Sequence, residues 1–274
     1  MGKLQSAKSV MLNFSDFYQI NSKNSSDSSE TIIAEVAGKD SIAAILQVAK
    51  KSSIKKLVGI GINHRSFYGN IDEPTEHFEY ISNDKALLNI KKTEFMYLDV
   101  SSLFDLLIVR TLAIVQKHFH YFSPCPACHL FFHMMRVPIA HHLKVAKFIT
   151  GERDIHGTRK KLNQLPEVLD LLKILLEKEG INLIQPLKSI TKDEEIFTLL
   201  GKKWVSALPY KCSFSGNYYD ENGKIPFNTT NVLNSLSNFY YPLFHETIHY
   251  IELHKNEPDW NWIEKTLLDI IEEF

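Results

Sequence analysis

This 274-residue sequence has few cysteines, no excess of charge of one sign and no long apolar run. It holds only three cysteines, an odd number that argues against a framework of paired disulfides. Lysine and arginine total 31 against 32 aspartates and glutamates, so the net charge of -1 creates no strong basic field of the kind that attracts nucleic acid. The longest apolar candidate, Phe104 to Val115, is interrupted by Asp105 and Arg110 and is too short to span a membrane.

Glycine and proline are also scarce, at 11 and 10 residues, while 44% of the residues are hydrophobic. This composition excludes disordered, collagen-like and low-complexity chains and is typical of a globular protein. The first residues are followed by a polar stretch rather than by an apolar core and a cleavage site, so no secretory signal is visible. We therefore expect a cytoplasmic protein that does not enter membranes.

Short β-branched apolar runs alternate with segments of helical periodicity along most of the chain. This alternation predicts an α/β fold with a parallel, doubly wound sheet. Residues 63–93 mix aromatic and polar side chains without clear periodicity and have no predicted structure. We expect strands at 31–36, 56–62, 95–100, 145–150 and 181–185; helices at 41–50, 102–116, 126–144, 165–179 and 192–200; a loop-rich stretch at 211–230; and helices over 231–274 interrupted near Pro258.

A candidate phosphate-binding turn joins the first predicted strand to the first predicted helix. Small residues allow backbone N–H groups to approach an anion, and the helix N-terminus adds partial positive charge. Lys39 can add a full charge and Ser41 a hydroxyl. The alternative is a plain turn, because short glycine-containing loops before helices are common. The turn consists of Val36, Ala37, Gly38, Lys39, Asp40 and Ser41.

This turn resembles the SGGxDS loop of the PP-loop ATP pyrophosphatases, the adenine nucleotide alpha-hydrolase superfamily. Gly38 to Ser41 match that pattern, whereas Val36 and Ala37 replace its serine and first glycine. The resemblance implies that the chain binds ATP and Mg²⁺ at this turn, with Asp40 as a catalytic residue. Backbone contacts would survive the replacements, although the methyl group of Ala37 narrows the approach relative to glycine.

Two later segments extend the resemblance. The run from Gly59 to His64 resembles the family's second strand, so Gly61 and Ile62 are expected beside the adenine. The turn with Gly151 and Arg153 resembles the family's Gly-His turn and is expected to contact the nucleotide, with Glu152 in place of the customary histidine. The expected organisation is a lead with a Ser-rich linker over 1–30, a PP-loop domain over 31–212 and a mainly helical C-terminal extension over 213–274.

The three cysteines form a second candidate site. Cys125 and Cys128 make a CxxC pair before a predicted helix, and Cys212 lies in a loop-rich stretch. Such a pair suits zinc, an iron–sulfur cluster, a redox dithiol or simple core packing. A structural zinc site normally needs four ligands, so zinc would also require a histidine such as His129 or His133.

The layout of these cysteines resembles that of the iron–sulfur tRNA 2-thiolation enzymes within the PP-loop superfamily. The resemblance implies that Cys125, Cys128 and Cys212 hold a 4Fe-4S cluster with one iron free of protein ligands, and that the protein is a homodimer. It also implies an ATP-dependent sulfur transfer, in which ATP adenylates an oxygen of the acceptor and sulfur from a donor then displaces AMP. The expected acceptor is tRNA or a small molecule, because the additional zinc-binding cysteines of those enzymes are missing here.

Two other functions stay open beside sulfur transfer. One is a PP-loop amide ligase whose cysteines bind structural zinc, and the other is a nucleotide-binding protein without turnover. A competing motif, His245-Glu246-Thr247-Ile248-His249, is a literal HExxH and would indicate a zinc hydrolase if a third ligand were present. Arg153 and His156 are further candidates for contacts with the nucleotide or the acceptor.

Overall fold

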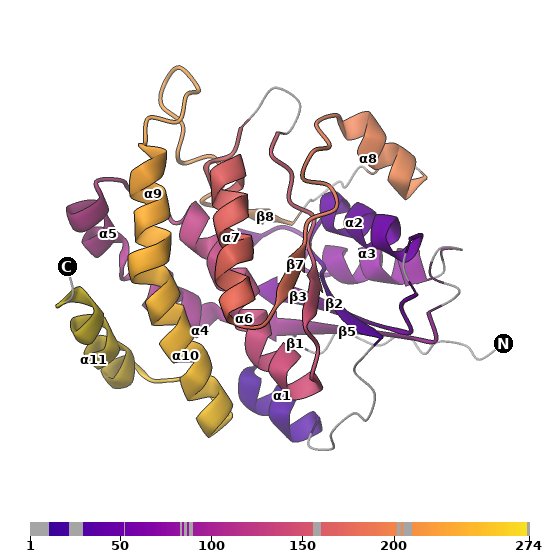
Figure 1. The fold of residues 1–274 in the computed structure, drawn as a ribbon, viewed down its shortest axis with the longest axis horizontal. Helices are drawn as coiled ribbons and strands as arrows, with labels where there is room; N and C mark the ends of the chain where they lie inside the picture. The colour runs from indigo at the N-terminus through magenta and orange to yellow at the C-terminus, as the bar shows by residue number, and fades with distance from the viewer. Residues whose placement is uncertain are drawn as a thin grey trace.

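Six short strands form one fully parallel sheet (Figure 1), which confirms the predicted α/β class. The computed structural model describes residues 11–21, 30–51, 53–82, 84, 87, 90–155, 160–201, 204 and 210–272. The strands lie in the order β1 (Met11–Leu12), β5 (Lys92–Asp99), β3 (Lys56–Asn63), β2 (Thr31–Glu35), β6 (Lys147–Ile149) and β7 (Asn182–Ile184).

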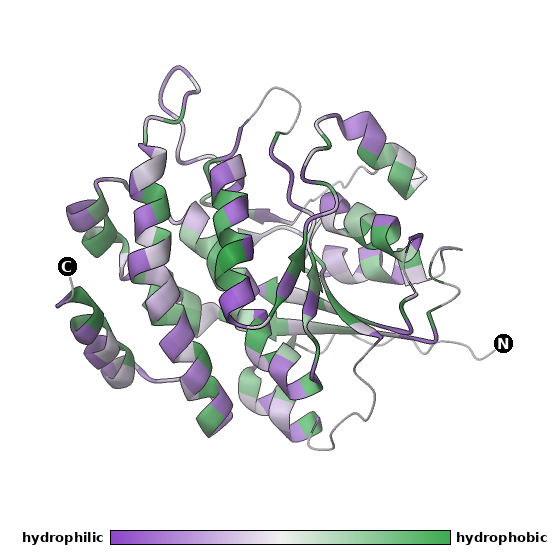
Figure 2. Cartoon of the chain, viewed as in Figure 1, coloured by the Kyte–Doolittle hydropathy of each residue, from purple (hydrophilic) through white to green (hydrophobic). Residues whose placement is uncertain are grey.

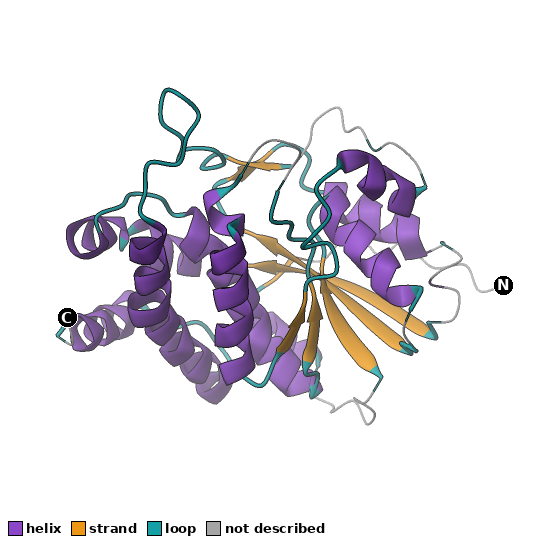
Figure 3. Ribbon diagram, turned by 45° about the horizontal axis from the view of Figure 1, so that its top comes forward, coloured by secondary structure: helices purple, strands orange, loops and turns teal. Residues whose placement is uncertain are grey.

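Helices cover both faces of this sheet (Figure 3), as a doubly wound fold requires. Within β2, Ile33 belongs to one hydrophobic core, whereas Ile32 and Ala34 belong to the other. A strand that is buried on both faces needs an unbroken apolar run, which explains the TIIA segment. One core packs under α1 (Phe14–Ile20), α6 (Cys125–Leu143) and α7 (Pro166–Lys178), and the other under α2 (Lys39–Ala49), α3 (Glu73–Ser82) and α8 (Asp193–Leu200).

The strand order reverses between β2 and β6. From β2 the chain proceeds to β3 and β5 on one side, then crosses to β6 and β7 on the other. In open parallel sheets, ligands bind outside the carboxyl ends of the strands at such a switch point. The turn after β2 and the segment after β6 therefore flank the position at which this fold favours a ligand.

The segment without a predicted structure contains α3 and a short strand, β4 (Phe67–Tyr68). This strand pairs antiparallel with β8 (Lys211–Cys212), so that Phe67 lies opposite Cys212. The pairing joins the segment after β3 to the stretch that was expected to be rich in loops. It also brings the third cysteine to the carboxyl edge of the sheet.

The N-terminal lead contributes a strand and a helix to the fold, whereas residues 22–29 of the expected Ser-rich linker lie outside the described residues. β1 pairs with β5 at the edge of the sheet, and α1 buries Phe14 and Phe17 completely. Asn13 caps α1, because its side chain accepts a hydrogen bond from the backbone N–H of Asp16, and the backbone N–H of Asn13 donates one to the carboxylate of Asp16. This reciprocal cap fixes a helix of only two turns.

The C-terminal segment is helical with a break around Pro258, as predicted. It consists of α9 (Thr229–Ser235), a π-helical turn (Leu236–Tyr240), α10 (Tyr241–His254) and α11 (Trp260–Ile271), which stand together beside α5 (Leu112–Phe119) in Figure 1. Their apolar sides face α6 and α5, while polar residues occupy the outer side (Figure 2). In the part of the chain that the structure describes, no helix is long and apolar enough to cross a membrane.

A charged contact fastens α10 to α6. His141 Nδ1 lies 2.6 Å from Glu252 Oε1, and its Nε2 lies 2.9 Å from the backbone oxygen of Glu179. Both partners are acceptors, so both ring nitrogens carry protons and His141 is an imidazolium. The hydrogen bond to Glu252 raises the pKa of His141.

We expect Glu252→Gln to lower the free energy of unfolding in a pH-dependent way. A pKa that is raised in the folded state stabilises the protein below the unfolded pKa, and this stabilisation is lost as pH rises through the folded pKa. The contact is partly exposed, so a loss of about 0.5–1 kcal/mol is expected at about pH 5.5 and almost none at about pH 9. Guanidinium unfolding at both pH values measures it. Glu246→Gln, on an exposed residue of the same helix, serves as the control, and an equal loss at both pH values would contradict the assignment.

Candidate functional site

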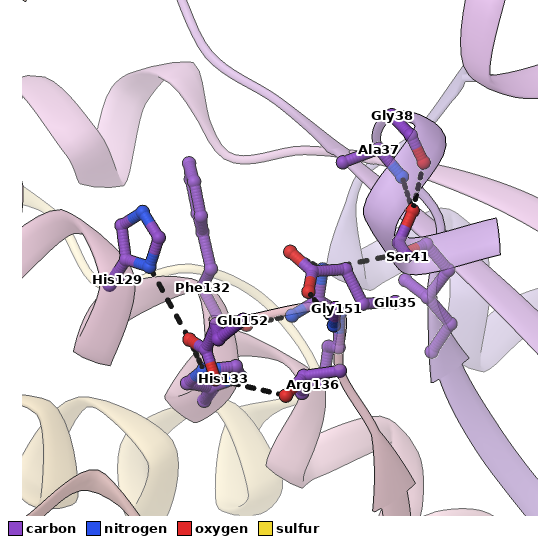
Figure 4. A network of polar contacts seen from close by, with 12 residues as sticks. Glu35, Ala37, Gly38, Ser41, His129, Phe132, His133, Arg136, Gly151 and Glu152 are labelled. Atoms are coloured by element: carbon purple, nitrogen blue, oxygen red, sulfur yellow. Dashed lines mark hydrogen bonds and ion pairs between the residues drawn. The ribbon is translucent and has the colours of Figure 1, made fainter. Parts of the chain in front are cut away.

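The turn after β2 is closed by hydrogen bonds within itself (Figure 4). The Ala37 N–H donates to Ser41 Oγ over 3.0 Å, and that hydroxyl donates to the backbone oxygen of Gly38 over 2.8 Å. Gly38 is the N-cap of α2 and has extended backbone angles. The Ser41 hydroxyl thus shapes the turn, and the N–H groups at the start of α2 are the groups left to face an anion.

Gly151 allows the end of β6 to pack directly on the start of α2. A Cβ atom at this position would lie 2.3 Å from the backbone nitrogen of Ser41 and 2.5 Å from the carbonyl carbon of Asp40. Only glycine fits such an approach. The two segments that flank the switch point therefore touch through their backbones.

Two cations and a carboxylate lie beside this turn. Arg153, which is buried, donates from Nη2 to Asp193 Oδ1 over 2.7 Å and places Nε 3.3 Å from Asp40 Oδ2. Lys39 forms an ion pair with the same Asp193. Burial alone would raise the pKa of Asp193, but hydrogen bonds from Lys39 and Arg153 lower it to about 2. Burial raises the pKa of Asp40, against the opposing charges of Arg153 and Lys39.

A cavity of about 290 Å³ opens beside the turn. Ile62, which was expected beside the adenine, is among the residues that line this turn cavity. The space beside Gly61, in contrast, is taken by the rings of Tyr97 and Phe95. The other lining residues are Glu35, Val36, Ala37, Gly38, Lys39, Phe67, Glu73, His77, Phe132, Arg136, Trp204 and Tyr210.

The three cysteines come together around a second cavity of about 140 Å³. Cys125 and Cys128 lie in the first turn of α6, and Cys212 ends β8. Among the described residues, no three His, Cys, Asp or Glu side chains converge as the ligands of a single metal ion do. The three thiols line the wall of this cavity and do not converge on one position at its centre. This cysteine cavity is also lined by His64, Phe67, Pro124, His129, Phe132, Lys161, Asn163, Gln164, Phe214, Ser215 and Tyr218.

Burial dominates the acidity of the thiols. It raises the pKa of Cys125 to about 12 and raises the pKa of Cys128 and of Cys212 as well. The Cys125 sulfur lies 3.5 Å from the backbone oxygen of Phe214, to which its thiol donates. Metal ions bind thiolates and not thiols, so a positive charge in the cavity would stabilise the form that binds metal.

A buried carboxylate organises the middle of α6 (Figure 4). Glu152 Oε1 accepts from His133 Nε2 over 2.8 Å and from His129 Nδ1 over 3.3 Å. Its Oε2 accepts from Thr150 and Gln185 over 2.9 and 3.0 Å. Burial would raise the pKa of Glu152, but the two histidines hold it well below its usual range. Both histidines therefore have hydrogen-bond partners in Glu152, whereas the sequence indicated them only as possible zinc ligands.

One face of α6 runs along both cavities. Residues spaced by three or four positions share a helix face, and the spacing here places the cysteines, the Glu152 partners and Arg136 in one row. Phe67 and Phe132, whose ring centroids are 5.9 Å apart, line both cavities and stand between them. The row consists of Cys125, Cys128, His129, Phe132, His133 and Arg136.

Lys161 carries positive charge between the two candidate sites. It lines the cysteine cavity and acts electrostatically on both Cys125 and Asp40. Burial lowers the pKa of Lys161, and Asp40 raises it. The sequence alone does not indicate this role for Lys161, because the effect of Lys161 on Asp40 depends on the tertiary fold.

The HExxH motif lies apart, on α10. His245 is half-buried and His249 is exposed, with their Nε2 atoms 3.1 Å apart and His245 Nδ1 2.8 Å from Glu179. Neither histidine belongs to a three-ligand group among the residues that the structure describes, as a zinc hydrolase requires. His156 lies outside the described residues.

Comparison with known proteins finds a relative of this chain in an archaeon. A search of family models finds no match. The chain is 31% identical over 220 residues to a protein of Methanocaldococcus jannaschii named "Uncharacterized protein MJ0009", and the match covers 78% of each chain.

Proposed function

We propose that this chain, which belongs to the family of the archaeal protein MJ0009, is an ATP-dependent sulfurtransferase of the PP-loop type that uses a 4Fe-4S cluster. The observation that carries the proposal is the adjacency of a phosphate-type turn and a three-thiol cavity. Phe67 and Phe132 line both, so an acceptor held at this aromatic pair reaches the nucleotide on one side and the thiols on the other.

The turn supplies what the first step needs. An acceptor oxygen attacks the α-phosphorus of ATP, the bond to the β-phosphate breaks, and pyrophosphate leaves. Backbone N–H groups at the start of α2 bind the departing charge, together with Lys39 and Arg153 once the phosphates replace Asp193. Asp40 and Asp193 offer carboxylate oxygens of the kind that Mg²⁺ prefers.

The cysteine cavity supplies the second step. Sulfur attacks the activated carbon, and AMP leaves with the former acceptor oxygen. Cys125, Cys128 and Cys212 would hold the cluster, which when bound supplies an iron free of protein ligands to carry sulfur. Thiols placed around a space suit a cluster, because each ligates a different iron, whereas zinc draws all its sulfurs to about 2.3 Å from one point. Lys161 lines the cysteine cavity and acts on Asp40, so its positive charge offsets the negative charge of thiolates and phosphates at the two sites.

A second candidate function is a PP-loop amide ligase with structural zinc. His129 favours it, because this residue lines the cysteine cavity and the Asn163 amide donates to its Nε2 over 2.5 Å. Its Nδ1–H donates to Glu152, so Nε2 carries the lone pair, and a metal ion would take the place of the Asn163 amide there. A zinc site of three cysteines and one histidine would also require the thiols to draw together around one point.

Anaerobic purification followed by iron, sulfide and zinc analysis on one sample separates these functions. We expect about four irons and four sulfides per chain, and ATP-dependent pyrophosphate release with thiolated products in tRNA or small metabolites. Two crossed variants sharpen the result: Lys39→Ala should keep the cluster and lose pyrophosphate release, while Cys128→Ala should lose the cluster. Zinc alone after attempted reconstitution would overturn the cluster and favour the ligase.

A further inference from the structure

We propose that His64 is a positioning residue that donates a hydrogen bond from Nε2 to the sulfur of Cys128 and so tunes the metal bound there. This inference rests on the proposed function, since it takes Cys128 as a metal ligand. The sequence placed His64 in the segment next to the adenine, whereas the structure places it in the cysteine cavity.

Packing fixes the orientation of the His64 ring. The side chain follows β3 directly, is 1% exposed and stacks on Phe104 with centroids 3.9 Å apart and planes 14° apart. Phe67 packs against it at 4.1 Å. A phenylalanine would satisfy both contacts equally well, so packing does not account for the two nitrogens of a buried imidazole.

A backbone group fixes the tautomer. The Ser66 N–H lies 3.2 Å from His64 Nδ1, and a backbone amide only donates. Nδ1 therefore accepts, and the proton of the neutral ring is on Nε2. This nitrogen lies 3.8 Å from the Cys128 sulfur. The geometry directs an N–H donor to a buried sulfur.

Two consequences follow for a metal bound at Cys128. A donor hydrogen bond withdraws electron density from a ligating thiolate, and such bonds raise the reduction potential of iron–sulfur clusters. The proton on Nε2 also occupies the lone pair through which imidazole binds metal, so His64 acts only through Cys128. The hydrogen-bond donors differ between the cysteines: Cys128 faces the His64 side chain, whereas Cys212 receives backbone hydrogen bonds from Phe214 and Ser215.

The tautomer is testable in the unaltered protein. We expect ¹⁵N-edited spectra of the folded chain to identify His64 as the neutral Nε2–H form. An Nδ1–H form would overturn the inference without any substitution, so a variant that fails to fold cannot leave the question open.

A matched pair of variants tests the effect on the metal. His64→Phe keeps the ring and removes the donor, whereas His64→Gln loses the ring and keeps an N–H at a similar reach. We expect His64→Phe to shift the one-electron reduction equilibrium of the cluster about tenfold toward the oxidised form, which is about 59 mV. His64→Gln should restore most of this shift. With Co²⁺ alone as the probe, the thiolate-to-cobalt absorption should move to lower energy in His64→Phe.

The outcomes separate the two proposals. If the wild-type cysteines take up neither the cluster nor Co²⁺, the metal site of the proposed function fails, and the inference fails with it. If they take up metal and His64→Phe matches the wild type in potential and in the cobalt spectrum, the inference alone is overturned.

Discussion

Cys212→Ala is expected to abolish sulfur transfer while the chain still binds ATP. Cys212 lies on β8, opposite Phe67, and contributes one of the three thiols of the cysteine cavity. Because Cys212 does not line the turn cavity, at which we propose that ATP binds, ATP affinity should stay within about twofold of the wild type, a change below 0.5 kcal/mol. Iron content, product formation and ATP binding measured on the same preparation check this.

The matching control for this variant is His249→Ala. This residue belongs to the HExxH motif on the exposed side of α10, and its loss should alter neither iron content nor turnover. A Cys212→Ala protein with full turnover would exclude the cluster function. Loss of activity in His249→Ala would instead favour a catalytic role for the HExxH motif.

Gly151→Ala should lower both the free energy of unfolding and the affinity for ATP. The added methyl group would lie 2.3 Å from the backbone of Ser41, and backbone atoms in a helix start cannot move aside as a flexible side chain can. Separating β6 from α2 should destabilise the fold by about 2–4 kcal/mol, as overpacking in a tight interior does. It should also weaken ATP binding by tenfold or more, because the phosphate-type turn is displaced.

Gly38→Ala is the stability control for that prediction. Its Cβ would meet nothing within 4 Å, and its backbone is extended, so unfolding should differ from the wild type by less than about 0.5 kcal/mol. Denaturant unfolding and ATP titration of both variants compare the two positions. Equal stability of Gly151→Ala and Gly38→Ala would contradict the close approach of β6 to α2.

The sequence predicted most of the parallel sheet, because strands buried on both faces have continuous apolar runs. It missed β1, β4 and β8, which are two residues long and too short to show a period. It predicted the turn at 36–41 from its position between a strand and a helix, and it placed the cysteines in one site through a resemblance. It could not predict that Glu152 would gather His129 and His133, since those contacts depend on the packing of β6 against α6.

His64 and Lys161 illustrate the same limit at the candidate site. His64 lies just before β4, whose position is set by its pairing with β8. The chemistry of both residues depends on a neighbour far away in the sequence, such as Cys128 for His64. Local periodicity contains no information about such neighbours.

The edge position of β1 has a consequence for synthesis of the chain. Met11 pairs with Tyr97, so the first strand leaves the ribosome long before its partner strand exists. Phe14 and Phe17 wait longer still, because their core includes α6, where Phe17 packs against His142, and exposed aromatic side chains promote aggregation. A nascent chain of this protein would therefore depend on chaperones until α6 has been made.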